Sequence, residues 1–376
     1  MISRDPFSVL IPDGESPQAL GVVRCLSQIK NIKIYLLSNK SWPLTRFSRY
    51  SKHFISYKTD KGNEGRLNEI LSAVNKTKAD VVLPADANTI GLLTEHCSLF
   101  SKITSLVFLP HPETFKIASN KWLLAKWAKE NQVPCPPTIL YQTKNNLKEI
   151  LPAITFPVLI KPAIGSNGKG IKYFSDAESL KSFLNKNGDT RDLIIQSFIT
   201  GYDIDCSVLC REGEILAYTI QKTFREGARR FGVAAGVDFL YDDSTYKVVK
   251  DIIQKLNWSG IVHIDLRYDE KDQQVKVIEM NPRYWGSVIG SLHAGVNFPY
   301  MACLAALGGD LPKVIHQPTR FVNNSLAIQI MLKRFFHKNY TDLYFDHSKM
   351  EFLLKDPLPK VVEICSGSYS RFIHKR

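Results

Sequence analysis

The chain has 376 residues, of which 44% are hydrophobic, 11% aromatic and 23% charged, a composition typical of globular proteins. At ~150 residues per domain, this length predicts two or three domains. No apolar run approaches the ~18 residues that cross a bilayer, so we expect no membrane span. The apolar run 7–11 is too short for a secretory signal, and we expect a cytoplasmic protein.

The net charge of the chain is +13, which fits an anionic partner such as a nucleotide, a nucleic acid or a membrane surface. Residues 313–376 hold 11 Lys and Arg against 5 Asp and Glu, so +6 of this charge lies there. No segment interleaves aromatic and basic residues as RNA-binding modules do, and we expect no nucleic-acid partner. The seven cysteines never show a CxxC spacing, which argues against a disulfide framework and a zinc site.

The N-terminal part of the chain has the pattern of a parallel α/β sheet. Short apolar runs that predict buried strands lie at 7–11, 32–37, 80–84 and 106–109. A helix is predicted at about 17–29, and strands separated by helices favour a parallel sheet. The turn Pro12–Gly14 follows the first strand, where open α/β sheets place their ligands.

Beyond this part, the periodicity predicts one helix over Phe115–Gln132, ended by the proline cluster of Val133–Pro137. A second α/β unit is expected at about 138–200. Residues 204–221 and 261–281 then show the alternation of antiparallel strands. After Leu311 the pattern weakens.

A lysine and three glycines follow one buried strand. The apolar run 156–160 leads into Lys161, and Gly165, Gly168 and Gly170 come next. Glycines allow backbone N–H groups to surround phosphate oxygens, and a lysine adds a positive charge. The same residues also suit the end of a strand and a hairpin turn. Taken alone, this segment leaves both interpretations open.

Residues 260–281 predict a hairpin that carries two opposed carboxylates. Pairing about the polar turn would set Asp265 opposite Glu279 and His263 opposite Asn281, with all four on one face. Opposed carboxylates repel, and a hard divalent cation with an added amide oxygen relieves that repulsion. A solvent-facing hairpin with its charges paired by nearby arginines is the alternative. The hairpin alone does not decide between the two.

The order of these motifs resembles the ATP-grasp superfamily, which includes D-alanine–D-alanine ligase, biotin carboxylase and the large subunit of carbamoyl-phosphate synthetase. The resemblance runs from about Lys116 to Leu311 and, more loosely, over the N-terminal part. Its elements are a lysine near a helix start, a strand-borne lysine, a glycine loop, the hinge segment Gln196–Ile199, a strand acid and Glu279–Arg283.

The resemblance implies an ATP site and assigns its residues. Those implied to bind ATP are Lys121, Lys161, Gly165, Ser166, Asn167, Gly168, Gly170, Gln196, Ile199 and Asp203. In the family, the two lysines contact phosphates, the glycine loop covers the β- and γ-phosphates, the hinge meets adenine and the acid holds the ribose. This sequence has Gln196 where the hinge usually begins with Glu, and Asp203 where the ribose acid is often Glu.

The same resemblance implies a metal site and a catalytic pair. Asp265, Glu279 and Asn281 match the ligands of Mg²⁺, with Mn²⁺ as a substitute. Arg283 matches the arginine that holds the acylphosphate oxygens, and Lys161 and Arg283 are the implied catalytic residues. No role follows for Arg225, Arg229, Arg230 and His263.

The expected fold is therefore α/β: a pre-ATP-grasp domain at 1–114, then a two-subdomain ATP-grasp fold at 115–311 whose lid subdomain covers about 138–198. Residues 312–376 are expected to form a small basic C-terminal extension.

The resemblance implies a ligase that activates a carboxylate as an acylphosphate and joins it to an amine, with release of ADP and phosphate. Its partners would be a small-molecule carboxylate and amine, and a homodimer is left open. The segment 43–50 loosely resembles ligases similar to D-aspartate ligase. Alternatives are a biotin-carboxylase-like enzyme that uses bicarbonate, a non-catalytic ATP-binding sensor and a basic nucleic-acid-binding protein.

Overall fold

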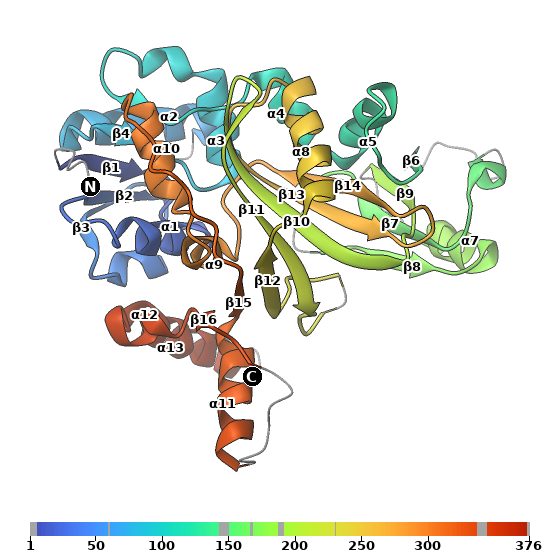
Figure 1. Cartoon of the computed structure of the whole chain (residues 1–376). Coiled ribbons are helices and arrows are strands. Elements are labelled where there is room, and N and C mark those ends of the chain that lie inside the picture. Colours follow the sequence, from blue (N-terminus) through green and yellow to red (C-terminus); the bar gives the residue numbers. More distant parts are fainter. Residues whose placement is uncertain are drawn as a thin grey trace.

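The computed structural model of this chain describes residues 6–58, 61–142, 150–165, 168–186, 192–229, 231–336 and 344–373. It contains three β-sheets (Figure 1). The largest sheet lies in the middle, with the N-terminal sheet on one side and a smaller sheet on the other. No helix of the described residues is long and apolar enough to span a membrane.

The N-terminal sheet has five parallel strands in the order β3-β2-β1-β4-β5. The strands are β1 Ser8–Ile11, β2 Lys33–Ser38, β3 Ser51–Ser56, β4 Val81–Val82 and β5 Ser105–Leu106. Three helices pack on the sheet: α1 Ala19–Leu26, α2 Gly62–Thr77 and α3 Ala87–Glu95. Val9 packs toward α1, whereas Leu10 packs toward α2 and α3, so the continuous apolar run of β1 is buried on both faces. The predicted parallel sheet is confirmed.

The central sheet has seven strands in the order β14-β13-β10-β11-β12-β15-β16. Its strands are β10 Gly201–Arg211, β11 Glu214–Arg225, β12 Gly236–Leu240, β13 Gly260–Asp269, β14 Gln274–Asn281, β15 Thr319–Val322 and β16 His347–Ser348. All neighbours are antiparallel except the β15–β16 pair, as the alternation in 204–221 and 261–281 predicted.

Helices cover both faces of the central sheet. On one face, α5 Lys121–Glu130 and α8 Asp243–Lys255 enclose a core that contains Trp258. On the other face, α9 Val288–His293 and α10 Phe298–Ala306 share one core with α1 of the N-terminal sheet. The N-terminal sheet and the central sheet are therefore joined by continuous apolar packing.

The third sheet has four antiparallel strands in the order β6-β9-β7-β8. They are β6 Thr138–Tyr141, β7 Val158–Pro162, β8 Lys172–Phe174 and β9 Leu193–Ser197. Helix α7 Ala177–Lys186 packs on them through Leu180 and Leu184. This sheet forms the arm on the right of Figure 1.

The single helix predicted over Phe115–Gln132 is two helices, α4 Pro112–Ala118 and α5. The break has a local cause, because the Asn120 side chain accepts hydrogen bonds from the N–H groups of Trp122 and Leu123. Asparagine is among the preferred residues at a helix N-terminus. The break makes Lys121 the first residue of a new helix, and this position sets the direction of its side chain.

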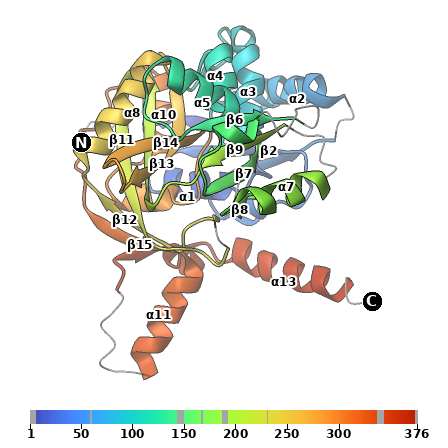
Figure 2. The ribbon, with the colours of Figure 1, turned by 90° about the vertical axis from the view of Figure 1, so that its right-hand side faces the viewer.

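The C-terminal residues return to the N-terminal sheet. After β15 come α11 Asn324–Phe336, α12 Glu351–Lys355 and α13 Leu358–Ile373, and the last two lie below α1 and α9 in Figure 1. Asp356, which ends α12, accepts hydrogen bonds from the Arg24 side chain, the Ser48 hydroxyl and the Arg49 backbone N–H. Figure 2 shows α11 and α13 extending away from the sheets.

Candidate active site

The β13–β14 hairpin has the predicted register. Asp265 lies opposite Glu279 and His263 lies opposite Asn281, and a bulge follows Asp265. Because strand side chains alternate, these four groups meet on one face of the central sheet, opposite to the face on which Ile264 and Met280 pack in the core under α5 and α8. Two carboxylates and an amide are therefore assembled side by side.

Lys121 joins this hairpin to the glycine loop. Its Nζ lies 2.8 Å from Glu279 Oε2 and donates to the carbonyl oxygen of Gly165 at 2.8 Å. The backbone N–H of Lys121 also bonds to the carbonyl oxygen of Ala163. The start of α5 is thus fixed between the end of β7 and the carboxylates of β14.

The two opposed carboxyl groups have very different acidities. Burial raises the pKa of Asp265 well above its usual value, and the neighbouring charge of Glu279 raises it further. Burial alone would also raise the pKa of Glu279, but Lys121 outweighs it and lowers that pKa to about 2. The pair therefore carries one proton on Asp265 and one negative charge on Glu279.

The donor set fits a hard divalent cation. Asp265 and Glu279 offer carboxylate oxygens, and Asn281 offers an amide oxygen on the same face. In the present arrangement the Asn281 amide nitrogen donates to both carboxylates, at 3.3 Å to Asp265 and 3.1 Å to Glu279. The Asn281 oxygen accepts from Arg283 at 3.0 Å. A cation would replace the Asp265 proton and the Lys121 charge as the counter-charge of these oxygens.

His263 and Asp205 complete the polar cluster. Ligand atoms of Asp205, His263 and Asp265 all lie within 4.8 Å of one another. Burial lowers the pKa of His263 to about 3, with Arg283 adding to this, so the imidazole is neutral. Its Nδ1 shares a hydrogen bond with Ser207 at 2.8 Å, and its Nε2 lies 3.2 Å from Asp265.

Asp205 was not predicted as a site residue. Burial raises its pKa to about 7, with the charge of Asp203 as a further cause, and it accepts a hydrogen bond from the Gln221 amide at 3.2 Å. The alternation of strand side chains puts Asp203 and Asp205 on one face. The spacing of two residues between Asp203 and Asp205 was therefore the sequence signal that could have identified Asp205.

Lys161 is buried at the end of β7. Its Nζ donates to the Gln196 side-chain oxygen at 2.8 Å, and the Gln196 amide donates to Thr138 at 3.0 Å. Burial lowers the pKa of Lys161 to about 8, although Glu279 opposes this shift. The charge of Lys161 therefore lies within electrostatic range of the Glu279 and Asp265 carboxylates.

Arg267 organises the predicted hinge and ribose residues. Its guanidinium pairs with the Asp203 carboxylate and donates to the carbonyl oxygens of Ile199 at 2.9 Å and Gly201 at 2.7 Å. Asp203 and Ile199, which the family resemblance assigned to ribose and adenine, are thus held by one arginine. Arg267 itself was not among the predicted site residues.

The glycine loop touches a basic loop. Gly168 has φ +67°, and a Cβ atom there would lie 2.0 Å from the carbonyl oxygen of Phe231. Only glycine allows this approach. Arg225 and Arg229 are exposed near this contact in sequence, whereas Ser166, Asn167 and Arg230 lie outside the described residues.

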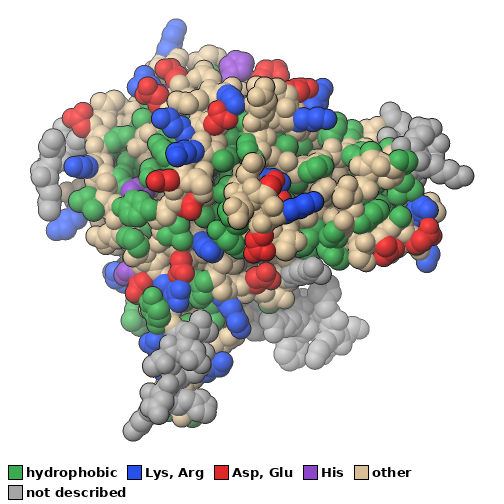
Figure 3. Space-filling view, turned by 45° about the vertical axis from the view of Figure 1, so that its right-hand side comes forward, with side chains coloured by type: hydrophobic (Ala, Val, Ile, Leu, Met, Phe, Trp, Pro, Cys, Tyr) green, Lys and Arg blue, Asp and Glu red, His purple; other side chains and the backbone are tan. Residues whose placement is uncertain are grey.

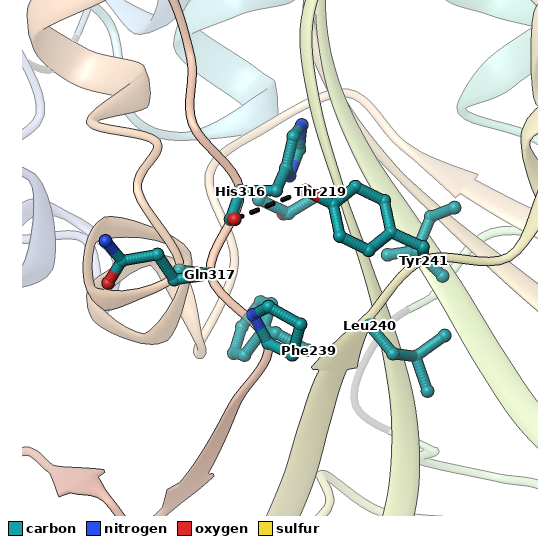
Figure 4. Close-up of a pocket in the computed structure, with 9 residues that line it drawn as sticks. Thr219, Phe239, Leu240, Tyr241, His316 and Gln317 are labelled. Carbon is teal, nitrogen blue, oxygen red and sulfur yellow. Dashed lines mark hydrogen bonds between the residues drawn. The ribbon is translucent and has the colours of Figure 1, made fainter.

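A small pocket elsewhere is too narrow for a substrate. It has a volume of about 10 Å³ and lies between β11, β12 and residues 316–318. Figure 4 shows Tyr241 over its edge, where the hydroxyl donates to the carbonyl oxygen of His316 at 3.2 Å. This volume admits about one water molecule.

The surface charge is mixed over the face shown in Figure 3, where basic and acidic side chains are interspersed. Nucleic-acid-binding surfaces gather positive side chains on one face or along one stripe. The visible face therefore lacks that pattern among the residues the figure colours.

The chain is similar to known proteins over its central residues. The sequence profile of the ATP-grasp domain matches residues 118–287. The carbamoyl phosphate synthase large chain, C-terminal section, of Methanopyrus kandleri is 24% identical over 206 residues, which is 51% of this chain and 38% of that protein. D-aspartate ligase of Enterococcus faecium is 21% identical over 230 residues, 56% of this chain and 54% of that protein.

Among solved structures, an L-amino acid ligase from Bacillus licheniformis superposes with a TM-score of 0.61 at 16% identity, over 80% of this chain and 73% of that chain. The chain spans between about a third and just over half the length of the two curated relatives named above. The matched region includes Lys121, the glycine loop, the predicted hinge and the β13–β14 hairpin. Residues 118–287 of this chain are an ATP-grasp domain, set beside a parallel α/β domain.

Proposed function

We propose that this chain is an ATP-dependent ligase that activates a carboxylate as an acylphosphate and joins it to an amine, releasing ADP and phosphate. The observation that carries this proposal is the meeting of Lys121, Glu279, Asn281 and Arg283 at one end of the hairpin. Cations and hard oxygen ligands in one place suit phosphoryl transfer, which depends on positioning and charge neutralisation more than on a protein nucleophile.

ATP would lie between the four-stranded sheet and the central sheet, as the ATP-grasp match supports. Lys121 and Lys161 would bind phosphate oxygens, and the loop from Gly165 to Gly170 would cover the β- and γ-phosphates. Gln196 and Ile199 would meet the adenine. Lys161 has a positive charge that burial already makes costly, so an anionic phosphate beside it is favoured.

Asp265, Glu279 and Asn281 would hold Mg²⁺, with Mn²⁺ as a substitute. When bound, the metal supplies Lewis-acid neutralisation of the phosphate charge. The protein's own contribution is to lose the proton of Asp265, since a ligand carboxylate must be ionised. Lys121 would then move its charge from Glu279 toward a phosphate.

In the proposed reaction, one carboxylate oxygen attacks the γ-phosphorus, the bond to the β–γ bridging oxygen breaks, and ADP leaves. Arg283 holds the oxygens of the acylphosphate. The amine nitrogen then attacks the acyl carbon, phosphate leaves with the bonding electron pair, and the amine loses a proton to solvent. Closure of the glycine loop against Phe231 would keep water from the acylphosphate.

An oxygen-isotope experiment tests this function. A substrate carboxylate labelled with ¹⁸O is incubated with Mg²⁺-ATP, an amine and the protein, and the phosphate is examined by mass spectrometry. Label in inorganic phosphate, with ADP as the other product, is expected. Label in AMP with pyrophosphate release would overturn the mechanism.

The same assay separates the other functions. ADP release that depends on bicarbonate and needs no amine would assign a biotin-carboxylase-like reaction. ATP binding without ADP release for any acid and amine would assign a sensor. Either result contradicts the ligase proposal.

A further inference from the structure

A groove lies where the C-terminal helices cross the N-terminal domain. It has a volume of about 270 Å³ and is bounded by α1, α9, α12 and α13. In Figure 1 this is the region between α9 and α1 above and α12 and α13 below. Leu20, Leu44, Val288, Ile289 and Leu353 give the groove an apolar lining. The volume lies near the lower end for small-molecule sites, roughly 300–1,000 Å³.

One cation in this groove has no counter-charge in contact. Among the described residues, no carboxylate lies within ion-pair distance of the Lys349 ammonium, and no hydrogen-bond acceptor contacts it. Burial lowers the pKa of Lys349, and the nearby charge of Arg24 adds to this. Arg24 is already paired with Asp356, and Lys360 is paired with Glu363 at 2.7 Å. The uncompensated charge in the groove is therefore that of Lys349, and it favours an anionic group.

Some residues that line the same groove carry buried polar atoms without hydrogen-bond partners. Among the described residues, nine buried side-chain polar atoms lack a hydrogen-bond partner, and three of these belong to groove residues: Gln18 Oε1, Trp285 Nε1 and Asn324 Oδ1. Buried polar groups in proteins nearly always have a partner. Two of the three are carbonyl oxygens, which accept hydrogen bonds from an ammonium or amine group. The groove thus offers an anion-binding cation together with acceptors for a positive donor.

Two side chains in contact, Trp285 and His263, connect the groove to the proposed metal site. Trp285, which lines the groove, stacks on His263 with ring centroids 5.5 Å apart, and His263 lies 3.2 Å from Asp265. Ser287 donates to Gln221 at 2.6 Å, and Gln221 donates to Asp205. The short segment after Arg283 therefore forms the wall of the groove and also contacts the metal-site cluster.

We propose that this groove binds an α-amino acid with an apolar side chain, whose amine is the acceptor of the acyl group. Lys349 binds the carboxylate, the side-chain oxygens of Gln18 and Asn324 accept from the amine, and the apolar lining receives the side chain. Naming the amine substrate rests on the proposed function, but the groove's ability to bind an amino acid does not. The C-terminal helices, through Lys349, would then determine the specificity of the ligase.

Calorimetry on the full chain without nucleotide tests the groove. The probes are leucine, isoleucine, valine, methionine and phenylalanine, with 4-methylpentanoate and isoamylamine as leucine analogues that lack the amine or the carboxylate. At least one of the five amino acids is expected to bind, and for leucine both analogues are expected to bind at least tenfold more weakly. No binding by any of the five would overturn the proposal. Equal binding of 4-methylpentanoate and leucine would overturn it too, because the groove would then be an anion site only.

Substitutions in the groove test whether the amino acid binds there. Lys349→Met keeps an apolar stem and is expected to weaken amino-acid binding at least tenfold. Lys355→Ala, on the exposed lysine that ends α12 six residues after Lys349, is the matched control and is expected to bind as the parent does. Asn324→Ala is a second test if Lys349→Met melts at a lower temperature. Parent-like binding by both Lys349→Met and Asn324→Ala would overturn the location.

Phosphate release with Mg²⁺-ATP separates this proposal from the ligase proposal. Amino-acid binding lost in Lys349→Met, with no phosphate released by the parent for any acid, would support the groove and contradict the ligase. Phosphate release with amines other than amino acids, and no calorimetric binding, would contradict the groove and support the ligase.

Discussion

Lys121 Nζ and Glu279 Oε2 lie 2.8 Å apart, so the first residue of α5 neutralises a carboxylate of the proposed metal site. The contact decides which of the two opposed carboxyl groups carries the proton. Lys121 lowers the pKa of Glu279 and so keeps it ionised, whereas the pKa of Asp265 is raised and Asp265 takes the proton. A lysine in this position acts as a counter-charge that a divalent cation can replace.

Two isosteric changes in the hairpin test this arrangement. Glu279→Gln and Asp265→Asn should each reduce ADP release by roughly 10²-fold or more, since each removes charge at the transferring phosphate. They should differ in stability. Glu279→Gln leaves Lys121 without its partner and should lower the melting temperature, whereas Asp265→Asn replaces a protonated carboxyl and should leave it unchanged or raise it. ADP release and thermal unfolding measure the two effects, and near-parent turnover in either variant would place the metal elsewhere.

Substitution of Lys161 should mainly change ATP affinity, whereas substitution of Arg283 should mainly change the rate of turnover. Lys161→Ala removes a buried charge proposed to bind ATP and should weaken ATP binding by about tenfold or more. Arg283→Ala should mainly lower kcat, because its charge is needed by the group that forms during transfer. ATP titration by calorimetry and steady-state kinetics separate these effects. Equal loss of ATP affinity in both variants would contradict the role of Arg283.

The contact of the glycine loop with Phe231 gives a third test. Gly168→Ala puts a Cβ 2.0 Å from a carbonyl oxygen and should shift the loop and reduce turnover. Gly62→Ala is the matched control, since Gly62 also has a positive φ, +56°, but its Cβ would meet nothing within 4 Å. Both changes carry backbone strain of about 1 kcal/mol. A larger loss of kcat/KM in Gly168→Ala than in Gly62→Ala would assign the effect to the loop contact, and equal losses would refute it.

Asp13 predicts a pH dependence of stability. Burial raises its pKa to about 7, and the neighbouring charge of Asp86 adds to this, although backbone N–H groups of Ala85 and Asp86 bond to the carboxylate. Its pKa is higher in the folded chain than in the unfolded chain, so its contribution is greatest below about pH 4 and falls as pH rises to about 7. Asp13→Asn removes this pH-dependent contribution to the free energy of unfolding. The variant should gain stability relative to the parent from pH 4 to pH 7, by up to roughly 4 kcal/mol at ~1.4 kcal/mol per pKa unit.

Urea unfolding of both proteins at each pH measures that difference. Above about pH 7 the difference should stay constant, because Asp13 is ionised in both states there. Asp205 and Asp265 titrate in the same way in the parent and in the variant, so they cancel in the comparison. A difference that does not change between pH 4 and pH 7 would contradict the raised pKa of Asp13.

Arg24 and Asp356 form a buried ion pair, so removing one partner should lower stability more than replacing both. Asp356→Ala leaves the Arg24 charge buried and should cost about 3–5 kcal/mol. Arg24→Met together with Asp356→Ala should cost less than Asp356→Ala alone. Equilibrium unfolding measures both, and an additive result in the double variant would show that the two side chains do not interact.

The sequence predicted the features that depend on local periodicity. The opposed Asp265 and Glu279 followed from the alternation of strand side chains, and this register is confirmed. The position of Asn120 as a helix cap was also readable, but the apolar spacing on both sides of it favoured one long helix. Hydrophobic spacing therefore predicted one continuous helix. In the structure the Asn120 side chain caps a second helix, α5, which begins after α4 has ended.

Contacts between distant segments could not be predicted in this way. Lys121 meets Glu279 because α5 packs beside β14, and Arg267 reaches Ile199 because β13 pairs with β10. Both contacts arise from packing and strand order, which single-sequence periodicity does not contain. The groove beside Lys349 likewise exists only because the C-terminal helices dock on α1.

The pairing of Arg24 with Asp356 joins residues 332 positions apart in the chain. During synthesis, α1 leaves the ribosome long before its counter-charge has been made, so the N-terminal domain first folds with an uncompensated cation on its surface. Docking of α12 buries that cation, because the Arg24 guanidinium then lies over the Phe352 ring with Asp356 beside it. The Arg24 charge is therefore compensated only after Asp356 has been made, and a ribosome stalled before that residue would hold a chain in which α1 lacks this partner.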